Sequence, residues 1–129
     1  MIAGIGLDLC EIERMQRAIA RPRFIGRVFT AAEAARIAAA ADLRRAEIAA
    51  GLFAAKEAVS KALGTGLAGI GISEIEITPD AAGRPCCALS GKALERARAL
   101  CGEGFTVWVS ITHEAGLAAA TAILESGTR

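Results

Sequence analysis

The chain has 129 residues, a formal net charge of +1, a hydrophobic fraction of 53% and no tyrosine. This length predicts one domain over residues 1–129, and a near-neutral chain with few aromatic residues lacks the basic field and stacking platforms of a nucleic-acid binder. No apolar run reaches the roughly 20 residues that span a bilayer and no export signal begins the chain, so we expect a cytoplasmic protein that does not bind membranes.

The first predicted element is a buried strand over residues 2–9, which is mostly apolar and contains two glycines. Gly4-Ile5-Gly6 is not a dinucleotide-binding fingerprint, because no third glycine opens a helix at the required spacing. Asp8 is unusual, since a carboxylate at the end of an apolar strand is costly unless something pairs with it. Two interpretations remain open: Asp8 caps the following helix, or it binds a metal ion.

A basic surface with apolar anchors is expected next. Residues 11–20 predict a helix whose inner stripe holds Ile12, Met15 and Ile19. The arginines that lie off this stripe or shortly after it are Arg14, Arg17, Arg21, Arg23 and Arg27, with Phe24 and Ile25 among them. This surface is either an ordinary solvated face or a docking site for an acidic partner.

Two further helices begin at recognisable signals. Thr30 and Glu33 form a capping box, which predicts that a helix begins at the next residue after Thr30 and runs through the alanines that follow. Asp42 is the predicted N-cap of a longer helix. Arg44 and Arg45 lie in its first turn, where positive charges oppose the helix dipole, and this placement indicates an anion nearby.

Residues 53–66 read FAAKEAVSKALGTG and predict the second half of this long helix, followed by a glycine turn. The predicted inner stripe consists of Leu52, Ala55, Val59, Ala62 and Leu63. Glu57 and Lys61 lie one turn apart and point away from it, and Gly64 stands where a helix end favours positive φ. The charged pair is either a surface ion pair worth roughly a few tenths of a kcal/mol or part of a functional site.

The C-terminal half predicts a sheet with one more helix. Its expected elements are a glycine loop over 64–71, a hairpin of strands over 72–78 and 86–89, a helix from Ser90 to about 102, and strands over 105–112 and 117–124. The last segment also fits a helix, and strand is favoured. The only histidine, His113, directly follows a strong strand, where a surface role is the simplest interpretation. The cysteines lack metal-ligand spacing and are expected to be reduced thiols: Cys10, Cys86, Cys87 and Cys101.

Three motifs resemble those of the holo-[acyl-carrier-protein] synthase family, the small bacterial type of 4′-phosphopantetheinyl transferase. They are Gly4-Ile-Gly-Leu-Asp8, residues 53–66, and Val109-Ser-Ile-Thr-His-Glu114. The resemblance implies an α+β fold, in which a mostly antiparallel sheet packs with a long helix and shorter helices, and a homotrimer with its sites between subunits. Because alanine buries little area, a monomer would have a thin core, which independently keeps an oligomer open.

The resemblance implies a magnesium-dependent transfer of 4′-phosphopantetheine from coenzyme A to a serine of acyl carrier protein, which releases adenosine 3′,5′-bisphosphate and supplies holo carrier protein to fatty acid synthesis. Asp8 and Glu57 match the metal ligands, and Lys61 matches a lysine near the phosphates. Stretches that resemble coenzyme A contacts contain Arg44, Arg45, Gly64, Pro85, Thr112 and His113. The expected carrier-protein surface contains Arg14, Arg17, Arg21, Phe24 and Ile25.

The residues fit this chemistry on their own terms as well. Magnesium takes only one or two protein carboxylates together with phosphate oxygens and water, and Asp8 and Glu57 supply two. Lys61 can take up charge on a departing phosphate, and Glu57 is the favoured general base. Leu52 departs from the family, which often has a basic residue there, so a phosphate contact is missing or replaced. The alternative function is a non-catalytic module that binds an acidic protein through residues 14–27.

Overall fold

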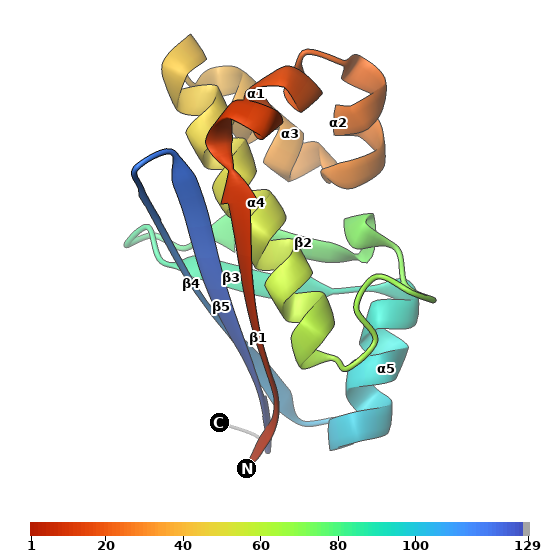
Figure 1. Cartoon of the computed structure of the whole chain (residues 1–129). Helices are drawn as coiled ribbons and strands as arrows, with labels where there is room; N and C mark the ends of the chain where they lie inside the picture. Colours follow the sequence, from red (N-terminus) through yellow and green to blue (C-terminus); the bar gives the residue numbers. More distant parts are fainter. Residues whose placement is uncertain (128–129) are drawn as a thin grey trace.

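The computed structural model describes residues 1–127 and has the expected α+β architecture (Figure 1). Its elements are β1 (Ile2–Glu11), α1 (Ile12–Ile19), α2 (Pro22–Val28), α3 (Ala31–Ala39), α4 (Asp42–Ala62), the 3-10 turn η1 (Ile72–Glu74), β2 (Ile75–Pro79), β3 (Pro85–Leu89), α5 (Gly91–Cys101), β4 (Phe105–Glu114) and β5 (Leu117–Ser126). Within residues 1–127, the strands form one antiparallel five-stranded sheet in the order β1-β5-β4-β3-β2. The segment over 117–124 is therefore a strand, as favoured from the sequence.

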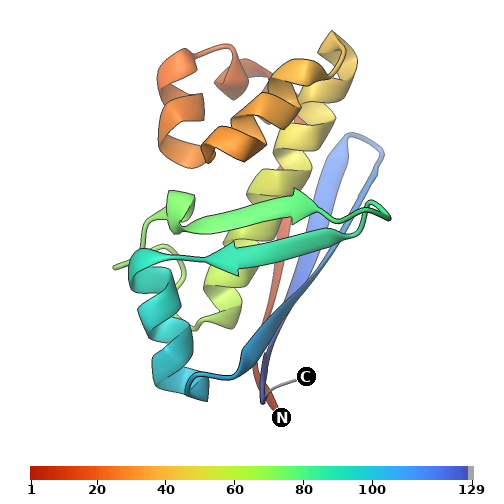
Figure 2. The same ribbon diagram turned by 180° about the vertical axis from the view of Figure 1, so that it is seen from behind.

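The sheet bends around the long helix α4. Strands β1, β5 and β4 run along one side of α4, whereas the β2–β3 hairpin crosses it at a steep angle (Figure 2). The hairpin joins the rest of the sheet through the pairing of Cys86 with Trp108. Helices α1, α2 and α3 gather at the N-terminal end of α4, and α5 lies toward its other end (Figure 1). No helix within the described range 1–127 is long and apolar enough to cross a membrane.

Helix α4 is buried on most of its sides. Twelve of its 21 residues are buried, so the stripe predicted from Leu52, Ala55 and Val59 is only part of its packed surface. Helices surrounded in this way contact neighbours all round instead of along one face. Six of the buried residues are alanines between Ala46 and Ala58. Their small side chains let the surrounding strands and helices approach the α4 backbone closely.

The closest approach is between α4 and β1. A Cβ atom added at Gly4 would lie 1.8 Å from the carbonyl oxygen of Ala62, and one added at Gly6 would lie 1.8 Å from that of Ala58. Real Cβ atoms are not found at such distances, so only glycine fits at these two positions. The Gly4-Ile5-Gly6 motif therefore serves helix–strand packing, consistent with the exclusion of a dinucleotide fingerprint.

The prediction that β1 is a buried strand was wrong for one of its faces. Gly4, Gly6 and Asp8 alternate toward α4, but the opposite side chains are open to solvent in the single chain. Ile5, Leu7 and Leu9 are 71%, 59% and 61% exposed. Successive residues of β1 point to opposite faces, so one face carries the glycines and Asp8 and the other carries large apolar side chains. Because nearly all of these residues are apolar, the sequence alone did not reveal that the two faces differ.

The helix starts agree with the sequence only in part. Thr30 and Glu33 form the predicted capping box: the Thr30 N–H donates to Glu33 Oε1 (2.9 Å), and the Glu33 N–H donates to Thr30 Oγ1 (3.3 Å). Asp42 is not an N-cap, because it is the first residue of α4 and Ala41 occupies the cap position. Ser90 occupies the cap position of α5 but makes no side-chain cap. Instead, the Glu74 carboxylate accepts the N–H groups of residues 92 and 93.

Helix α2 was not predicted from the sequence. It begins at Pro22, a residue that is favoured in the first turn because it has no N–H to leave unsatisfied. The arginines around it directed attention to surface charge and away from this start signal. Its Phe24 ring packs edge-on against the ring of Phe29, and the ring centroids of Phe24 and Phe53 are 6.4 Å apart.

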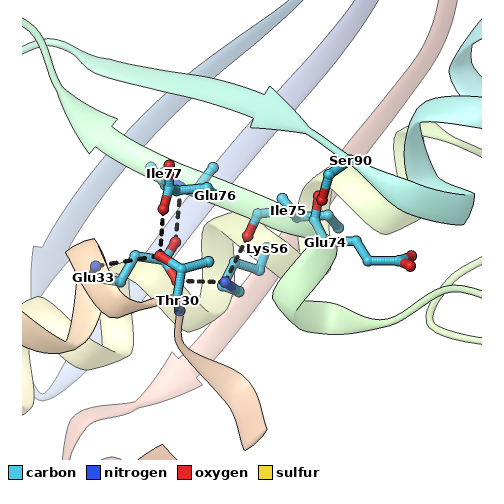
Figure 3. A network of polar contacts seen from close by, with 8 residues as sticks. All are labelled: Thr30, Glu33, Lys56, Glu74, Ile75, Glu76, Ile77 and Ser90. Atoms are coloured by element: carbon cyan, nitrogen blue, oxygen red, sulfur yellow. Dashed lines mark hydrogen bonds and ion pairs between the residues drawn. The ribbon is translucent and has the colours of Figure 1, made fainter. Parts of the chain in front are cut away.

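A buried ion pair ties α3, α4 and β2 together (Figure 3). The ammonium group of Lys56 donates to Glu33 Oε1 (2.5 Å) and to the Ile75 carbonyl (2.6 Å), and both charged side chains are fully buried. The second Glu33 oxygen accepts the N–H of Ile77 at 2.7 Å. Burial lowers the pKa of Lys56, and the hydrogen bond from Lys56 to Glu33 opposes that shift.

We expect Gly6→Ala to reduce the free energy of unfolding by about 1–3 kcal/mol, because the added methyl group would collide with the Ala58 carbonyl oxygen and push α4 away from β1. The matched control is Gly26→Ala in α2, where an added Cβ meets no atom within 4 Å. That change should stabilise by about 0.5–1 kcal/mol. Urea unfolding of the three proteins measures both effects, and equal behaviour of the two variants would contradict the close packing.

We expect Lys56→Met to reduce the free energy of unfolding by about 3–5 kcal/mol, because it leaves the Glu33 charge buried without a partner. Adding Glu33→Gln to this variant should restore part of the loss. The control, Lys61→Met, removes a lysine whose side chain is 49% exposed, and it should change the free energy of unfolding by no more than about 1 kcal/mol. Chemical denaturation measures all four proteins, and similar losses for Lys56→Met and Lys61→Met would count against the buried pair.

Candidate active site

Asp8, Glu57 and Lys61 lie together where α4 passes β1. The Lys61 ammonium group donates to Asp8 Oδ1 and to the Leu7 carbonyl oxygen, each at 3.0 Å. Asp8 does not cap the next helix, because β1 continues to Glu11 and Glu11 occupies the cap position of α1. Of the two interpretations of Asp8, the helix cap is therefore excluded. The sequence placed Lys61 beside Glu57, whereas the ion pair recorded for Lys61 is with Asp8.

The electrostatics of this group reflect two neighbouring carboxylates. Partial burial raises the pKa of Glu57, the negative charge of Asp8 raises it further, and Lys61 lowers it. Two carboxylates that influence each other in this way favour a cation between them. Within residues 1–127, no cluster of three or more metal-binding side chains exists. A metal ion held by Asp8 and Glu57 would therefore take its remaining ligands from substrate oxygens and water, which is the usual mode for magnesium.

A groove that we call the His113 groove lies on another side of α4. It is lined by Arg36, Arg44, Glu47, Ile48, Gly51, Leu52, Pro79, Gly83, Pro85, Ile111 and His113. In this groove, Glu47 contacts two basic side chains. One of its carboxylate oxygens is 3.5 Å from Arg44 Nη1 and the other is 3.7 Å from His113 Nδ1. Three of the residues proposed from the sequence, Arg44, Pro85 and His113, thus share one groove.

The other expected coenzyme A contacts do not line this groove. Thr112 and His113 are consecutive on β4 and point to opposite faces of the sheet. Arg45 is engaged elsewhere, since its guanidinium donates to the carbonyl oxygens of Ala40 (2.9 Å) and Ala38 (3.1 Å) at the end of α3. Gly64 has φ of +81° and ends α4, as predicted.

Asp8, Glu57 and Lys61 do not meet the His113 groove within one chain. Asp8 is on β1 and His113 is on β4, with β5 between them, which separates their backbones by about 10 Å at the usual strand spacing. Neither carboxylate nor Lys61 lines the groove. A substrate that used both regions would have to contact two separate surfaces of the chain, or one surface from each of two chains.

A second groove, the Arg14 groove, contains the predicted docking residues. It is lined by Leu9, Cys10, Glu11, Arg14, Met15, Arg17, Ala18, Arg21, Phe24, Phe53 and Leu117. Cys10 connects it to the carboxylates, because it follows Asp8 on the same face of β1. Burial and then the charge of Asp8 raise the pKa of Cys10. Phe24 and Ile25 both pack against the core, but only Phe24 also lines the groove.

Three residues were missed from the sequence, one in the core and two in the His113 groove. Lys56 lies four residues after Leu52 and three before Val59, so its spacing placed a charge on the inner stripe of α4. Glu47 lies three residues after Arg44, a spacing that by itself indicates no more than a surface pair. Arg36 gave no signal, because its position in the groove depends on how α3 packs against α4.

Comparison with known proteins decides the family. A model of the 4′-phosphopantetheinyl transferase superfamily matches residues 4–121. The chain belongs to this superfamily. Among curated members, it is 48% identical over 129 residues to the holo-[acyl-carrier-protein] synthase of Solidesulfovibrio magneticus, covering 97% of this chain and 99% of that protein. It is 43% identical over 128 residues to the synthase of Shouchella clausii, covering 98% and 100% of the two chains.

Solved structures of this superfamily have the same fold. The Bacillus anthracis synthase, a complex with CoA (3′,5′-ADP), superposes with a TM-score of 0.82 at 34% identity, covering 98% of this chain and 99% of that one. The Helicobacter pylori synthase in complex with coenzyme A gives a TM-score of 0.79 at 26% identity, covering 94% and 99%. The family resemblance and the α+β fold expected from the sequence are therefore confirmed.

Proposed function

We propose that this phosphopantetheinyl transferase moves 4′-phosphopantetheine from coenzyme A to a serine of acyl carrier protein and releases adenosine 3′,5′-bisphosphate. The observation that carries the proposal is the pairing of Asp8 and Glu57 beside Lys61, in a chain that is similar over its length to named holo-[acyl-carrier-protein] synthases. The supply of holo carrier protein to fatty acid synthesis follows from this activity. The four cysteines are free thiols, which fits the reducing cytoplasm.

In the proposed reaction, the serine oxygen attacks the phosphorus that bears pantetheine, and the bond from that phosphorus to the bridging oxygen of the pyrophosphate breaks. Glu57 accepts the proton of the serine hydroxyl, directly or through a bound water. Lys61 shifts from Asp8 toward the phosphate oxygens and compensates the charge of the leaving bisphosphate. Asp8 and Glu57 would hold the magnesium ion, which would supply charge that neutralises the pyrophosphate.

We also propose that the active form is a homotrimer in which each site uses two subunits. Ile5, Leu7 and Leu9 form an exposed apolar row on the outer face of the sheet, and soluble chains cover such rows by association. The separation between Asp8 and His113 leaves each chain with two partial sites. In the trimer, the carboxylate group of one chain would lie beside the His113 groove of its neighbour, so that one coenzyme A reaches both.

The direct test of the function is the intact mass of a purified apo acyl carrier protein after incubation with this protein, coenzyme A and magnesium. We expect the mass to increase by one phosphopantetheine group, and chelation of magnesium to prevent the change. A carrier protein that binds but keeps its mass would support the non-catalytic module instead.

We expect Asp8→Ala and Glu57→Ala each to lower kcat by at least about a hundredfold while the fold survives, since either change leaves the anionic substrate uncompensated. A thermal shift provides a readout besides activity: magnesium should raise the melting temperature of the parent and not that of either variant. Glu95→Gln, which changes an exposed carboxylate on α5, is the control for both measurements. Activity within a few-fold of the parent in either variant would refute the metal assignment.

We expect Arg14→Glu to raise the KM for carrier protein by about tenfold, with little change in the KM for coenzyme A. Arg14 and Arg17 lie on the rim of the Arg14 groove with side chains 75% and 67% exposed, and arginine can bind a carboxylate of an acidic protein through two hydrogen bonds. Added salt should weaken carrier binding by the parent more than by the variant. Arg98→Glu on α5 is the control, and an equal loss toward both substrates would place the docking surface elsewhere.

We expect two inactive chains to complement each other. Glu57→Ala removes one half of the site and His113→Ala weakens the other, so mixed trimers should contain some sites with neither change. Unfolding and refolding the two variants together should therefore restore part of the activity, whereas refolding each alone should not. Light scattering gives the oligomeric state in parallel, and a monomer at working concentration would rule out the shared site.

A further inference from the structure

The His113 groove contains an arginine that the sequence analysis did not assign to it. Arg36 enters it from the last turn of α3, Arg44 from the first turn of α4 and His113 from β4, and Glu47 is the only carboxylate on its lining. Leu52, where the family often has a basic residue, lies on the same lining and is buried. An aliphatic side chain cannot bind a phosphate, so any such contact in this groove must come from other residues.

Among the basic side chains on the lining, Arg36 is the one that no carboxylate of the described residues contacts. Glu47 contacts Arg44 at 3.5 Å and His113 at 3.7 Å, so both basic groups already share one carboxylate. Within residues 1–127, no ion pair or hydrogen bond involves the guanidinium of Arg36, which is exposed. A free guanidinium beside a carboxylate that is already shared leaves the groove able to take an additional anion.

A purely structural role for Arg36 explains less. A cation in the last turn of a helix interacts favourably with the helix dipole, and Arg36 occupies such a position in α3. However, the end of α3 is already capped by Arg45, which donates to the carbonyl oxygens of Ala38 and Ala40. Two carbonyl groups at this end of α3 therefore already have an arginine partner, and the Arg36 side chain lines the groove instead.

We propose that Arg36 binds the 3′-phosphate of coenzyme A and thereby sets the preference for a substrate that carries this group, an inference that rests on the proposed function. In that function, the pyrophosphate lies at Asp8, Glu57 and Lys61, which leaves the nucleotide end of the substrate for the His113 groove. The only anionic group at that end is the 3′-phosphate monoester. An arginine is well suited to bind this group, because its planar guanidinium can donate two hydrogen bonds to phosphate oxygens.

The test compares coenzyme A with 3′-dephospho-coenzyme A as substrates. Arg36→Ala should raise the KM for coenzyme A by about tenfold, the effect of losing a charge-assisted contact. The KM for dephospho-coenzyme A, the KM for carrier protein and kcat should stay within about twofold of the parent. Arg36→Lys should restore part of the loss, and Arg98→Ala, an exposed arginine on α5 outside the groove, is the matched control.

A binding measurement makes the test independent of catalysis. By calorimetry, Arg36→Ala should weaken the binding of adenosine 3′,5′-bisphosphate by about tenfold and leave the binding of adenosine 5′-monophosphate unchanged. Equal losses for ligands with and without the 3′-phosphate would overturn the proposal, as would a lower melting temperature with unchanged KM values, which indicates the helix-dipole role. If the parent binds the bisphosphate about tenfold more tightly than Arg36→Ala does but transfers no phosphopantetheine, the proposed function would be contradicted. The contact between Arg36 and the 3′-phosphate would still be supported.

Discussion

The arrangement of the molecule depends on the buried ion pair between Lys56 and Glu33. Two fully buried charges are tolerated only because each is satisfied: Lys56 binds Glu33 and the Ile75 carbonyl, and Glu33 also accepts the backbone N–H groups of Thr30 and Ile77. The pair therefore fixes both the position of α4 along its axis and its rotation about that axis, relative to α3 and the β2–β3 hairpin. Glu57 follows Lys56 directly and points about 100° away around the helix, toward β1. The rotation that buries the lysine thus also presents the carboxylate beside Asp8.

The second constraint is the contact of backbone with backbone between α4 and β1. Gly4 and Gly6 let the helix lie against the strand without side chains between them, and Asp8 is the next residue on the same face. At that point the strand carries its first polar side chain, and it meets Lys61 on the helix at 3.0 Å. The abundant alanines have the same effect around α4 as the glycines on β1, because their small side chains let neighbouring backbones pack closely. The candidate site is a product of this close packing.

Local signals in the sequence predicted most of the elements. The capping box of Thr30 and Glu33, the positive φ at Gly64 and the alternation from residue 105 onward each depend on neighbours within a few positions, and all three are present. Long-range properties were harder to predict. The cap of α5 comes from Glu74, which is remote in sequence from the cap position, and Arg36 reaches a groove lined by five elements, α3, α4, β2, β3 and β4. Asp8 and Glu57 were proposed as metal ligands from their motifs, whereas the contact of Asp8 with Lys61 depends on the register of β1 against α4.

One further consequence follows from the position of Trp108. It is the only tryptophan of a chain that has no tyrosine, so the ultraviolet emission of the protein comes almost entirely from one indole ring. Trp108 pairs with Ile123, and Ile123 pairs with Ile5, so the ring lies on the outer face of the sheet with the exposed apolar row of β1. Its indole N–H donates to Glu125 at 3.0 Å. The chain therefore contains an intrinsic fluorophore on the face of the sheet that carries the exposed apolar row, and its spectrum reports the polarity there without an added label.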